Sequence, residues 1–250
     1  MDMNRCRLRI RFRKEDDLRF IGHRDLVRLF ERLFRRAEFP LAMSQGFHPK
    51  PRMTFPSALA VGIVGRDEVM EVALAEQVEP QALVARLRPL LPEGLSVHDV
   101  TLLDAQDKKA QVWRVSYSVS LPDVWQARAV AAVAQFLKRP SIHVHRSGKA
   151  EPIDLRVGVQ QLRCTRTHLE MTLRADAAVQ VRPREVLAEL GLGELETKQG
   201  CYLVRTSVDL KTAGGSDTTT THQLAREQQT YEKGNPDQCL AAGRMPDCDR

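Results

Sequence analysis

The order of strand and helix patterns along this 250-residue chain predicts an α+β fold. Segments that alternate apolar and polar side chains, as strands do, stand between segments whose apolar residues recur at helical spacing. The order β-α-β-β-α-β occurs twice, and this order is typical of the ferredoxin-like fold. We therefore predict two ferredoxin-like units in tandem, over residues 1–107 and 108–210. A disordered tail is predicted for residues 211–250, because so polar a sequence buries too little apolar surface to offset the entropy lost on ordering.

The first unit opens with a strand in which arginine alternates with apolar residues. Residues 5–13 read Arg-Cys-Arg-Leu-Arg-Ile-Arg-Phe-Arg, so one face is apolar and the other carries five arginines. Charges of one sign at a two-residue repeat repel one another unless an anionic group lies near them. A helix with an arginine-rich outer side is predicted over residues 24–37; Pro40 ends it, and the spacing of Glu31 and Arg35 predicts an ion pair. The rest of the unit is predicted as a helix at 80–91 and strands at 41–43, 53–55, 59–64, 68–74 and 95–103.

The second unit repeats this order without visible sequence identity to the first. Its first helix is rich in Ala and Val, and Pro140 terminates it. The predicted strands of this unit are 112–121, 142–144, 153–162, 168–173 and 201–208, and its predicted helices are 124–137 and 183–190.

A proline-stiffened loop follows the first helix, with the sequence Ser-Gln-Gly-Phe-His-Pro-Lys-Pro-Arg over residues 44–52. Each proline fixes its own φ and pushes the residue before it toward extended backbone, while Gly46 permits a sharp bend. The loop therefore holds a hydroxyl, an imidazole, an ammonium and a guanidinium close together, and such groups bind phosphate or carboxylate. A preformed backbone lowers the entropic cost of that binding. The alternative is a stiff connection whose cations are only solvated.

The net charge of +6 is concentrated at the N-terminal end. Residues 1–52 hold 14 Lys and Arg against 7 Asp and Glu, a net charge of +7, which favours a polyanionic partner such as RNA. The five cysteines form no CxxC pair, and the sequence shows neither a signal-peptide pattern nor an apolar run long enough to span a bilayer. We therefore expect a reduced, cytoplasmic protein without a membrane partner.

Two groups of residues resemble a known family. The first occupies 11–14, 18–26, 31–37 and 44–52, and the second comprises Arg-Ser-Gly-Lys at 146–149 and Ile-Asp-Leu-Arg at 153–156. Over roughly residues 5–208 the chain is similar to the radical-SAM-linked protein family, a domain of unknown function found alone or fused behind a radical SAM domain. The resemblance implies a radical SAM protein as partner, and its second motif adds Lys149 and Arg156 to the candidate anion-binding residues. Where the family usually has serine this chain has Gly22, which removes a possible helix cap.

The candidate RNA- or anion-binding residues are Arg7, Arg9, Arg11, Arg13, His23, Asp25, Ser44, Gly46, Phe47, His48, Lys50, Arg52, Lys149 and Arg156. His23 and His48 are also candidate catalytic residues, since histidine can act as an acid or base on an RNA 2′-hydroxyl. Helix-start residues such as His23 and Asp25 more often serve as cap and dipole partners. His143 and His145 share a strand face without evident carboxylate or thiolate partners, so no metal site and no cofactor are predicted. Without a CxxxCxxC cluster, the chain is not expected to be a radical SAM enzyme itself.

Three functions of different classes follow. The leading hypothesis is a non-catalytic RNA-binding or substrate-presenting module that works with a radical SAM partner, on tRNA or rRNA. The second is a metal-independent RNA endonuclease that uses His23 or His48, by fold analogy with the tandem ferredoxin-like enzymes that process CRISPR repeats. The third is a protein-interaction adaptor whose arginines meet an acidic protein surface. The first strand offers arginines in place of stacked aromatics, which favours recognition of RNA shape and backbone over base reading.

Overall fold

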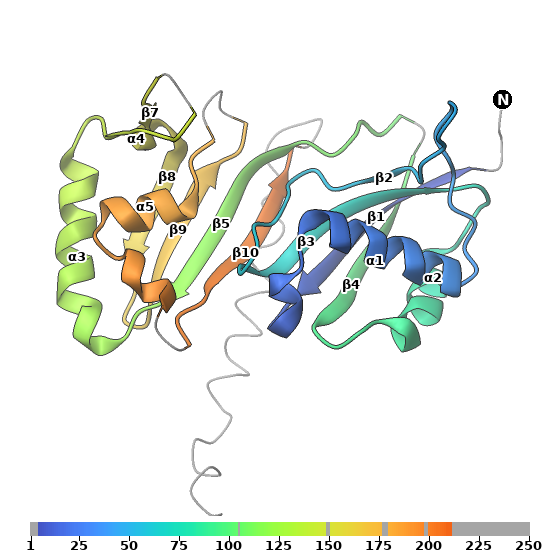
Figure 1. Ribbon diagram of the computed structural model, residues 1–250, viewed down its shortest axis with the longest axis horizontal. Coiled ribbons are helices and arrows are strands. Elements are labelled where there is room, and N and C mark those ends of the chain that lie inside the picture. The colour runs from blue at the N-terminus through green and yellow to red at the C-terminus, as the bar shows by residue number, and fades with distance from the viewer. Residues whose placement is uncertain (1–4, 105, 149–150, 177–179, 198–199, 212–250) are drawn as a thin grey trace, which may run out of the picture. The chain divides into compact units, whose positions relative to one another are not determined.

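The computed structural model describes residues 5–104, 106–148, 151–176, 180–197 and 200–211. Most of its strands form one large mixed sheet with the order β4-β1-β3-β10-β5-β9-β8 and with β2 paired to β3, while β6 and β7 form a small sheet of their own (Figure 1). The strands are β1 (Cys6–Lys14), β2 (Met53–Thr54), β3 (Val64–Leu74), β4 (Leu95–Leu103), β5 (Val112–Ser120), β6 (His143–Val144), β7 (Ile153–Asp154), β8 (Val159–Cys164), β9 (His168–Arg174) and β10 (Leu203–Leu210). The helices are α1 (His23–Arg36), α2 (Pro80–Leu87), α3 (Asp123–Lys138), α4 (Leu155–Gly158) and α5 (Pro183–Glu189), with 3-10 turns η1 (Asp16–Phe20), η2 (Arg88–Leu90) and η3 (Gly193–Thr197). The predicted α+β class is confirmed.

The strands of the two halves follow the same order within the sheet. In the first half β1 lies antiparallel between β3 and β4, and β2 runs antiparallel to β3. In the second half β5 lies antiparallel between β9 and β10, and β8 runs antiparallel to β9. The halves meet where β10 pairs with β3 in parallel, through Val204 with Val64 and Arg205 with Gly65. This short parallel contact makes one continuous sheet.

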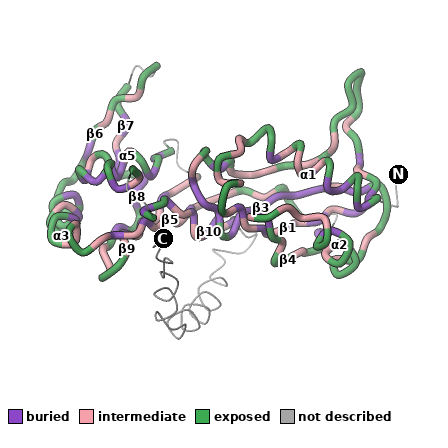
Figure 2. The backbone as a smooth tube through the Cα atoms, turned by 60° about the horizontal axis from the view of Figure 1, so that its bottom comes forward, coloured by how far each residue is buried: buried purple, intermediate pink, exposed green. Residues whose placement is uncertain are grey.

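Each half has an apolar core between its helices and its part of the sheet. Phe30 and Phe34 of α1 pack with Ile10 and Phe12 of β1 in the first half. The alternation that predicted β1 is therefore confirmed, since its apolar side chains are buried and its arginines are half-buried. In the second half, α3 and α5 pack on β5, β8 and β9. Figure 2 shows the buried residues concentrated along the strands and the outer loops exposed.

Four predicted elements differ from the structure. The predicted strand at 41–43 forms only isolated bridges, of Leu41 with Leu74 and of Met43 with Pro51, and the other three differ for local reasons. The predicted strand at 59–64 is an irregular segment up to Ile63, because Gly62 turns the chain with φ +85°. The predicted strand at 153–162 is divided into β7, α4 and β8, since the Asp154 carboxylate accepts the backbone N–H of Arg156 and caps α4. The predicted helix at 80–91 changes to 3-10 geometry at Arg88, beside Pro89, which has no N–H to donate.

The described residues up to 211 form one compact unit. The predicted boundary between residues 107 and 108 stays a prediction. Apart from Lys211, the predicted tail at 211–250 lies outside the described residues.

Candidate nucleic-acid interface

The arginines of β1 have anionic partners within the chain. Arg7 Nη2 lies 3.3 Å from Glu71 Oε2, and Arg9 Nη2 lies 2.9 Å from Glu71 Oε1. Arg11 Nη1 lies 2.5 Å from Asp67 Oδ2. Both carboxylates belong to β3 and are at most 6% exposed. The repulsion expected along β1 is thus relieved by the neighbouring strand, and a role in RNA binding for Arg7, Arg9, Arg11 and the half-buried Arg13 stays a prediction.

Asp67 also holds a histidine that sequence reasoning missed. His98 Nε2 on β4 lies 3.0 Å from Asp67 Oδ1, on the other side of the carboxylate from Arg11. Burial would raise the pKa of Asp67, but the hydrogen bond with His98 and the Arg11 guanidinium outweigh burial and lower that pKa below its ordinary value. Only long-range strand pairing brings these three residues together, so a local pattern could not reveal them.

The proline-stiffened loop is the outer part of a hairpin that we call the finger, residues 41–54. Its base adds to the edge of β3: the Ala42 N–H donates to Ala73 O at 2.9 Å, and the Ala73 N–H donates to Arg52 O at 2.9 Å. The Arg52 N–H donates to Ala42 O at 2.8 Å across the hairpin. Farther out, the Ser44 N–H donates to Lys50 O at 2.8 Å, and the Lys50 N–H donates to Ser44 Oγ at 2.9 Å. The predicted rigidity therefore has a structural basis in this ladder.

The tip of the finger combines an exposed aromatic ring with cations. Gly46 turns the chain with φ +126°, a conformation that favours glycine. Phe47 follows and is 102% exposed. His48, Lys50 and Arg52 are exposed, and within the described residues none of these three side chains forms an ion pair or hydrogen bond. An exposed ring among cations is typical of a surface that binds nucleic acid.

Helix α1 presents a second set of exposed cations, which we call the basic face of α1: Arg24, Arg28, Arg32, Arg35 and Arg36. Arg28 Nη1 lies 3.5 Å from Asp25 Oδ1, and both side chains are well exposed. Among the described residues, the predicted Glu31–Arg35 ion pair does not form. The four arginines other than Arg28 form no ion pair there either. Arg35 and Arg36 lie in the last turn of α1, where their positive charges interact favourably with the negative end of the helix dipole. Most of the positive charge on this helix is therefore available to a ligand.

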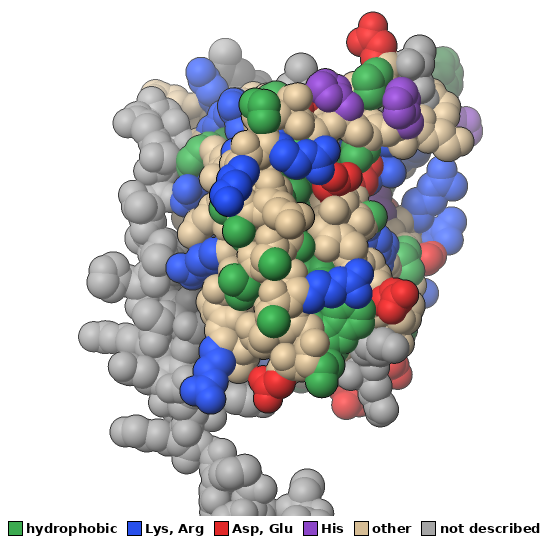
Figure 3. Space-filling model, turned by 90° about the vertical axis from the view of Figure 1, so that its left-hand side faces the viewer, with side chains coloured by type: hydrophobic (Ala, Val, Ile, Leu, Met, Phe, Trp, Pro, Cys, Tyr) green, Lys and Arg blue, Asp and Glu red, His purple; other side chains and the backbone are tan. Residues whose placement is uncertain are grey.

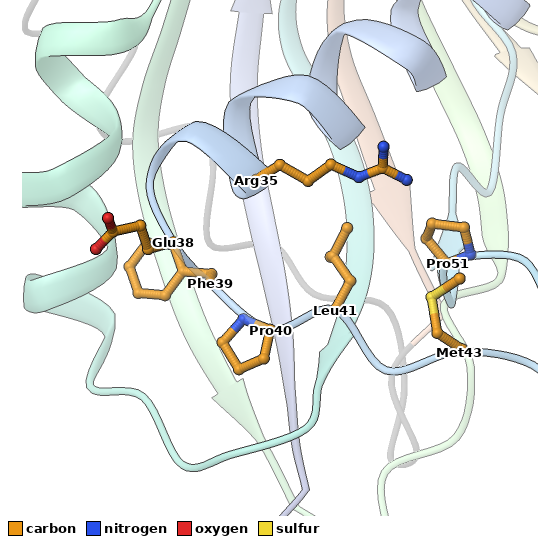
Figure 4. Close-up of a pocket in the computed structure, with 7 residues that line it drawn as sticks. All are labelled: Arg35, Glu38, Phe39, Pro40, Leu41, Met43 and Pro51. Atoms are coloured by element: carbon orange, nitrogen blue, oxygen red, sulfur yellow. The ribbon is translucent and has the colours of Figure 1, made fainter.

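A groove connects the finger with the end of α1 (Figure 4). Its volume is about 400 Å³, and its lining residues are Arg35, Glu38, Phe39, Pro40, Leu41, Met43 and Pro51. In Figure 4 the Arg35 side chain extends toward the finger residues Met43 and Pro51, whereas Glu38 lies at the other end. Arg86 lies 3.5 Å from the Glu38 carboxylate and stacks over the Phe39 ring at 4.3 Å. Because Glu38 is partnered, Arg35 is the lining side chain whose charge is not compensated within the described residues.

The structure places the candidate histidines apart. His23 begins α1, is exposed, and meets the Phe55 ring edge-on with centroids 5.4 Å apart. The residue before it, Gly22, makes no side-chain cap, as its lack of a side chain predicts. The finger starts beyond the other end of this 14-residue helix, which is about 21 Å long, and the chain returns to His23 at Phe55, after the finger. The described residues show no His23–His48 pair.

The second motif holds the β6–β7 hairpin in place. Arg146 binds Glu185 through two contacts, one of 2.7 Å from Nη2 to Oε2. Burial would raise the pKa of Glu185, but the interactions with Arg146 and the Arg182 N–H together outweigh burial and lower that pKa. Asp154 Oδ1 accepts the N–H groups of Ile142 and Arg156, both at 2.9 Å, and these bonds lower its pKa. Arg156 also donates to a backbone carbonyl and is half-buried over an aromatic ring. Lys149 lies outside the described residues.

Charge is less concentrated at the end of the second half than on the finger and the basic face of α1. Figure 3 shows the end of the second half, where Lys and Arg side chains stand singly among apolar ones. Exposed His143 and His145 belong to this half. Among the described residues, no group of three or more His, Cys, Asp or Glu side chains could hold a metal ion. In the same part of the chain no helix has the length and apolarity required to cross a bilayer.

A family model described as "Uncharacterized protein conserved in bacteria (DUF2344)" matches residues 7–183. The match begins in β1, ends at the start of α5, and includes the finger and the β6–β7 hairpin. No curated protein matches the chain.

Proposed function

We propose that this chain, which belongs to the family of uncharacterized bacterial proteins, is an RNA-binding module whose finger and basic face of α1 contact structured RNA. The observation that carries the proposal is the contrast between two sets of cations. The β1 arginines face internal carboxylates, whereas Lys50, Arg52 and Arg35 are exposed and have no carboxylate partner within the described residues. Cations without internal partners are available to phosphates.

The finger supplies geometry as well as charge. Lys50 and Arg52 flank Pro51 in a segment of the finger held by backbone hydrogen bonds, and Pro49 and Pro51 restrict the backbone around them. Arg35 borders the same groove from α1. Arg35 lines this groove and Lys50 and Arg52 stand on either side of the lining residue Pro51, so a phosphate backbone bound at this end of the finger would have cations of two elements to contact. Phe47 at the tip offers a ring face to a base. Because the finger is already ordered, little conformational entropy is lost on binding.

The proposal also includes the architecture and the partner. We infer that each half is a ferredoxin-like unit, since both follow the strand order fourth, first, third, second. We propose that the protein presents tRNA or rRNA to a radical SAM protein, a partner suggested by the resemblance of its two motifs. The endonuclease alternative gains no support from the separation of His23 and His48. The experiment below distinguishes the endonuclease and the adaptor from the RNA-binding module.

The test measures the affinity for a folded tRNA as a function of salt. Each phosphate contact releases counterions, so log Kd is expected to change with log salt with a slope of several units. Lys50→Ala and Arg52→Ala are expected to weaken binding by about 1–3 kcal/mol each, as charge-assisted hydrogen bonds are lost. Pro49→Gly keeps every charge and is expected to weaken binding through lost preorganisation.

Lys138→Ala is the matched control, because Lys138 is an exposed lysine at the end of α3 in the second half. It removes the same charge away from the finger, so it should have little effect. A flat salt response, or equal effects of Lys50→Ala and Lys138→Ala, contradicts the proposal. Cleavage of the RNA in EDTA would favour the endonuclease, and salt-sensitive binding of an acidic protein but no RNA would favour the adaptor.

A further inference from the structure

A guanidinium lies between two exposed aromatic rings at the junction of the two halves. Arg19 Cζ lies 4.3 Å from the centroid of the Phe20 ring and 4.3 Å from that of the Tyr202 ring. Phe20 belongs to η1, and Tyr202 immediately precedes β10. The rings are 55% and 41% exposed. Large rings with such exposure are available to a ligand, because the core does not cover them.

The stack is held from behind by backbone and buried groups. Arg19 Nη1 donates to Asp16 O at 3.0 Å. The carbonyl oxygen of Arg19 accepts the Gly62 N–H at 2.8 Å, and Lys14 Nζ donates to the Ile21 carbonyl at 2.9 Å. Lys14 is 1% exposed, so its ammonium acts as an internal anchor for the chain around η1. The stack is therefore preformed rather than assembled on binding.

The groove beside the stack is small and carries a net positive charge. Its volume is about 280 Å³, below the ~300–1,000 Å³ of clefts that enclose small molecules, so it suits one flat group of a larger ligand. Arg184 binds Glu196 through Nε–Oε2 at 2.9 Å and Nη2–Oε1 at 3.1 Å, which neutralises the carboxylate of the groove. Arg19 has no carboxylate partner among the described residues. The rings thus lie beside a cation whose charge is not compensated.

We propose that Phe20, Arg19 and Tyr202 form a stacking platform for an unpaired nucleobase of the RNA. This inference rests on the proposed function and names the part of the RNA that the platform recognises. Surfaces that bind single strands combine aromatic faces with cations, and every base has a face that can stack. The stack supplies two exposed ring faces, and Arg19 attracts the phosphate that accompanies the base. The finger and the basic face of α1 contact the paired backbone, whereas this platform selects RNA with an unpaired segment.

The test compares two RNAs of equal length, a hairpin with an unpaired loop and a fully paired blunt duplex. The wild-type protein should bind the hairpin more tightly. Tyr202→Leu removes a ring face and should weaken hairpin binding by about 5–150-fold, the range for loss of one stacked base, while duplex binding stays unchanged. Tyr202→Phe keeps the ring and is the matched control, so it should bind like the wild type. Melting of each variant checks that the fold is retained, as expected for a side chain that is 41% exposed.

The outcomes separate this inference from the proposed function. Equal affinity of the wild type for hairpin and duplex, or equal loss on both RNAs for Tyr202→Leu, overturns the platform. If Lys50→Ala still weakens the binding of both RNAs, the proposed function stands without the platform. If neither RNA binds the wild-type protein, the proposed function and the platform both fail.

Discussion

Replacement of Arg205 by methionine is expected to destabilise the protein, because it leaves the carboxylate of Glu68 buried without its main partner. Arg205 on β10 is 2% exposed and Glu68 on β3 is 3% exposed. Arg205 Nε donates to Glu68 Oε1 at 2.7 Å, and Nη2 donates to Oε2. The remaining donors bind Ser57 Oγ at 3.0 Å, Ser57 O at 3.1 Å and Ala58 O at 3.1 Å. All five N–H groups of the guanidinium therefore have an acceptor.

The magnitude follows from what each substitution leaves behind. Removal of one partner of a buried ion pair costs about 3–5 kcal/mol. For a unit of this size the midpoint of thermal unfolding should fall by about 6–20 °C. Glu68→Gln should also be destabilising, because it leaves Arg205 near the buried ammonium of Lys14, whose pKa burial already lowers. The ion pair also lies where the two halves of the sheet meet, and only two residue pairs join β10 to β3 there, so its loss should weaken this contact.

The assay is urea-induced unfolding of the wild type, Arg205→Met, Glu68→Gln, Glu68→Met and the double variant Arg205→Met/Glu68→Met. The double variant should be less destabilised than Arg205→Met alone, because neither member of the pair is left buried without the other and apolar side chains fill the site. Measured free energies of unfolding then give the coupling between the two residues. A loss below about 1 kcal/mol for Arg205→Met, or additive losses in the double variant, would refute this account.

Two further predictions concern the same strand. Gly65→Ala should lower the free energy of unfolding in the urea assay by about 1–3 kcal/mol, because an added Cβ would lie 2.6 Å from Glu68 Cγ. Gly193→Ala is the control, since the nearest neighbour of its Cβ would lie at 4.0 Å. Equal losses of stability in the two variants would contradict the clash. Asp67 has a folded pKa below its ordinary value of 3.8, so the stability it contributes is complete above pH 3.8 and is lost as the pH falls through the folded pKa. Asp67→Asn should lower the melting temperature at pH 7 and flatten its fall in acid; parallel wild-type and variant pH profiles would contradict this.

Elements with a strong local period could be predicted from the sequence. The alternation in β1 and the helical spacing in α1 gave their bounds to within one residue, because each has one apolar face that must be buried. Local chemistry overrode the pattern elsewhere. At Asp154 a carboxylate caps a helical turn inside what alternation predicts as one strand, and at Gly62 a positive φ turns the chain.

The candidate site could be predicted only where its residues are close in sequence. The finger is a single segment, so its prolines and cations indicated a stiff basic loop. The partners of the β1 arginines lie on β3, and no pattern within β1 shows which residue faces Arg9. The stack of Arg19 with Tyr202 joins opposite ends of the described chain. Such contacts depend on strand order, and the sequence offered no signal for them.

The partners of the arginines also explain why charge counting alone overstates the RNA-binding surface. Residues 1–52 carry a net charge of +7, yet Arg7, Arg9 and Arg11 interact with Glu71 and Asp67, which lie outside that range. A ligand would have to compete with those buried carboxylates for the β1 arginines, whereas it meets no carboxylate competitor at Lys50 or Arg52 within the described residues. The salt dependence of RNA binding should therefore be governed by the finger and the basic face of α1, while substitution of the β1 arginines should act first on stability.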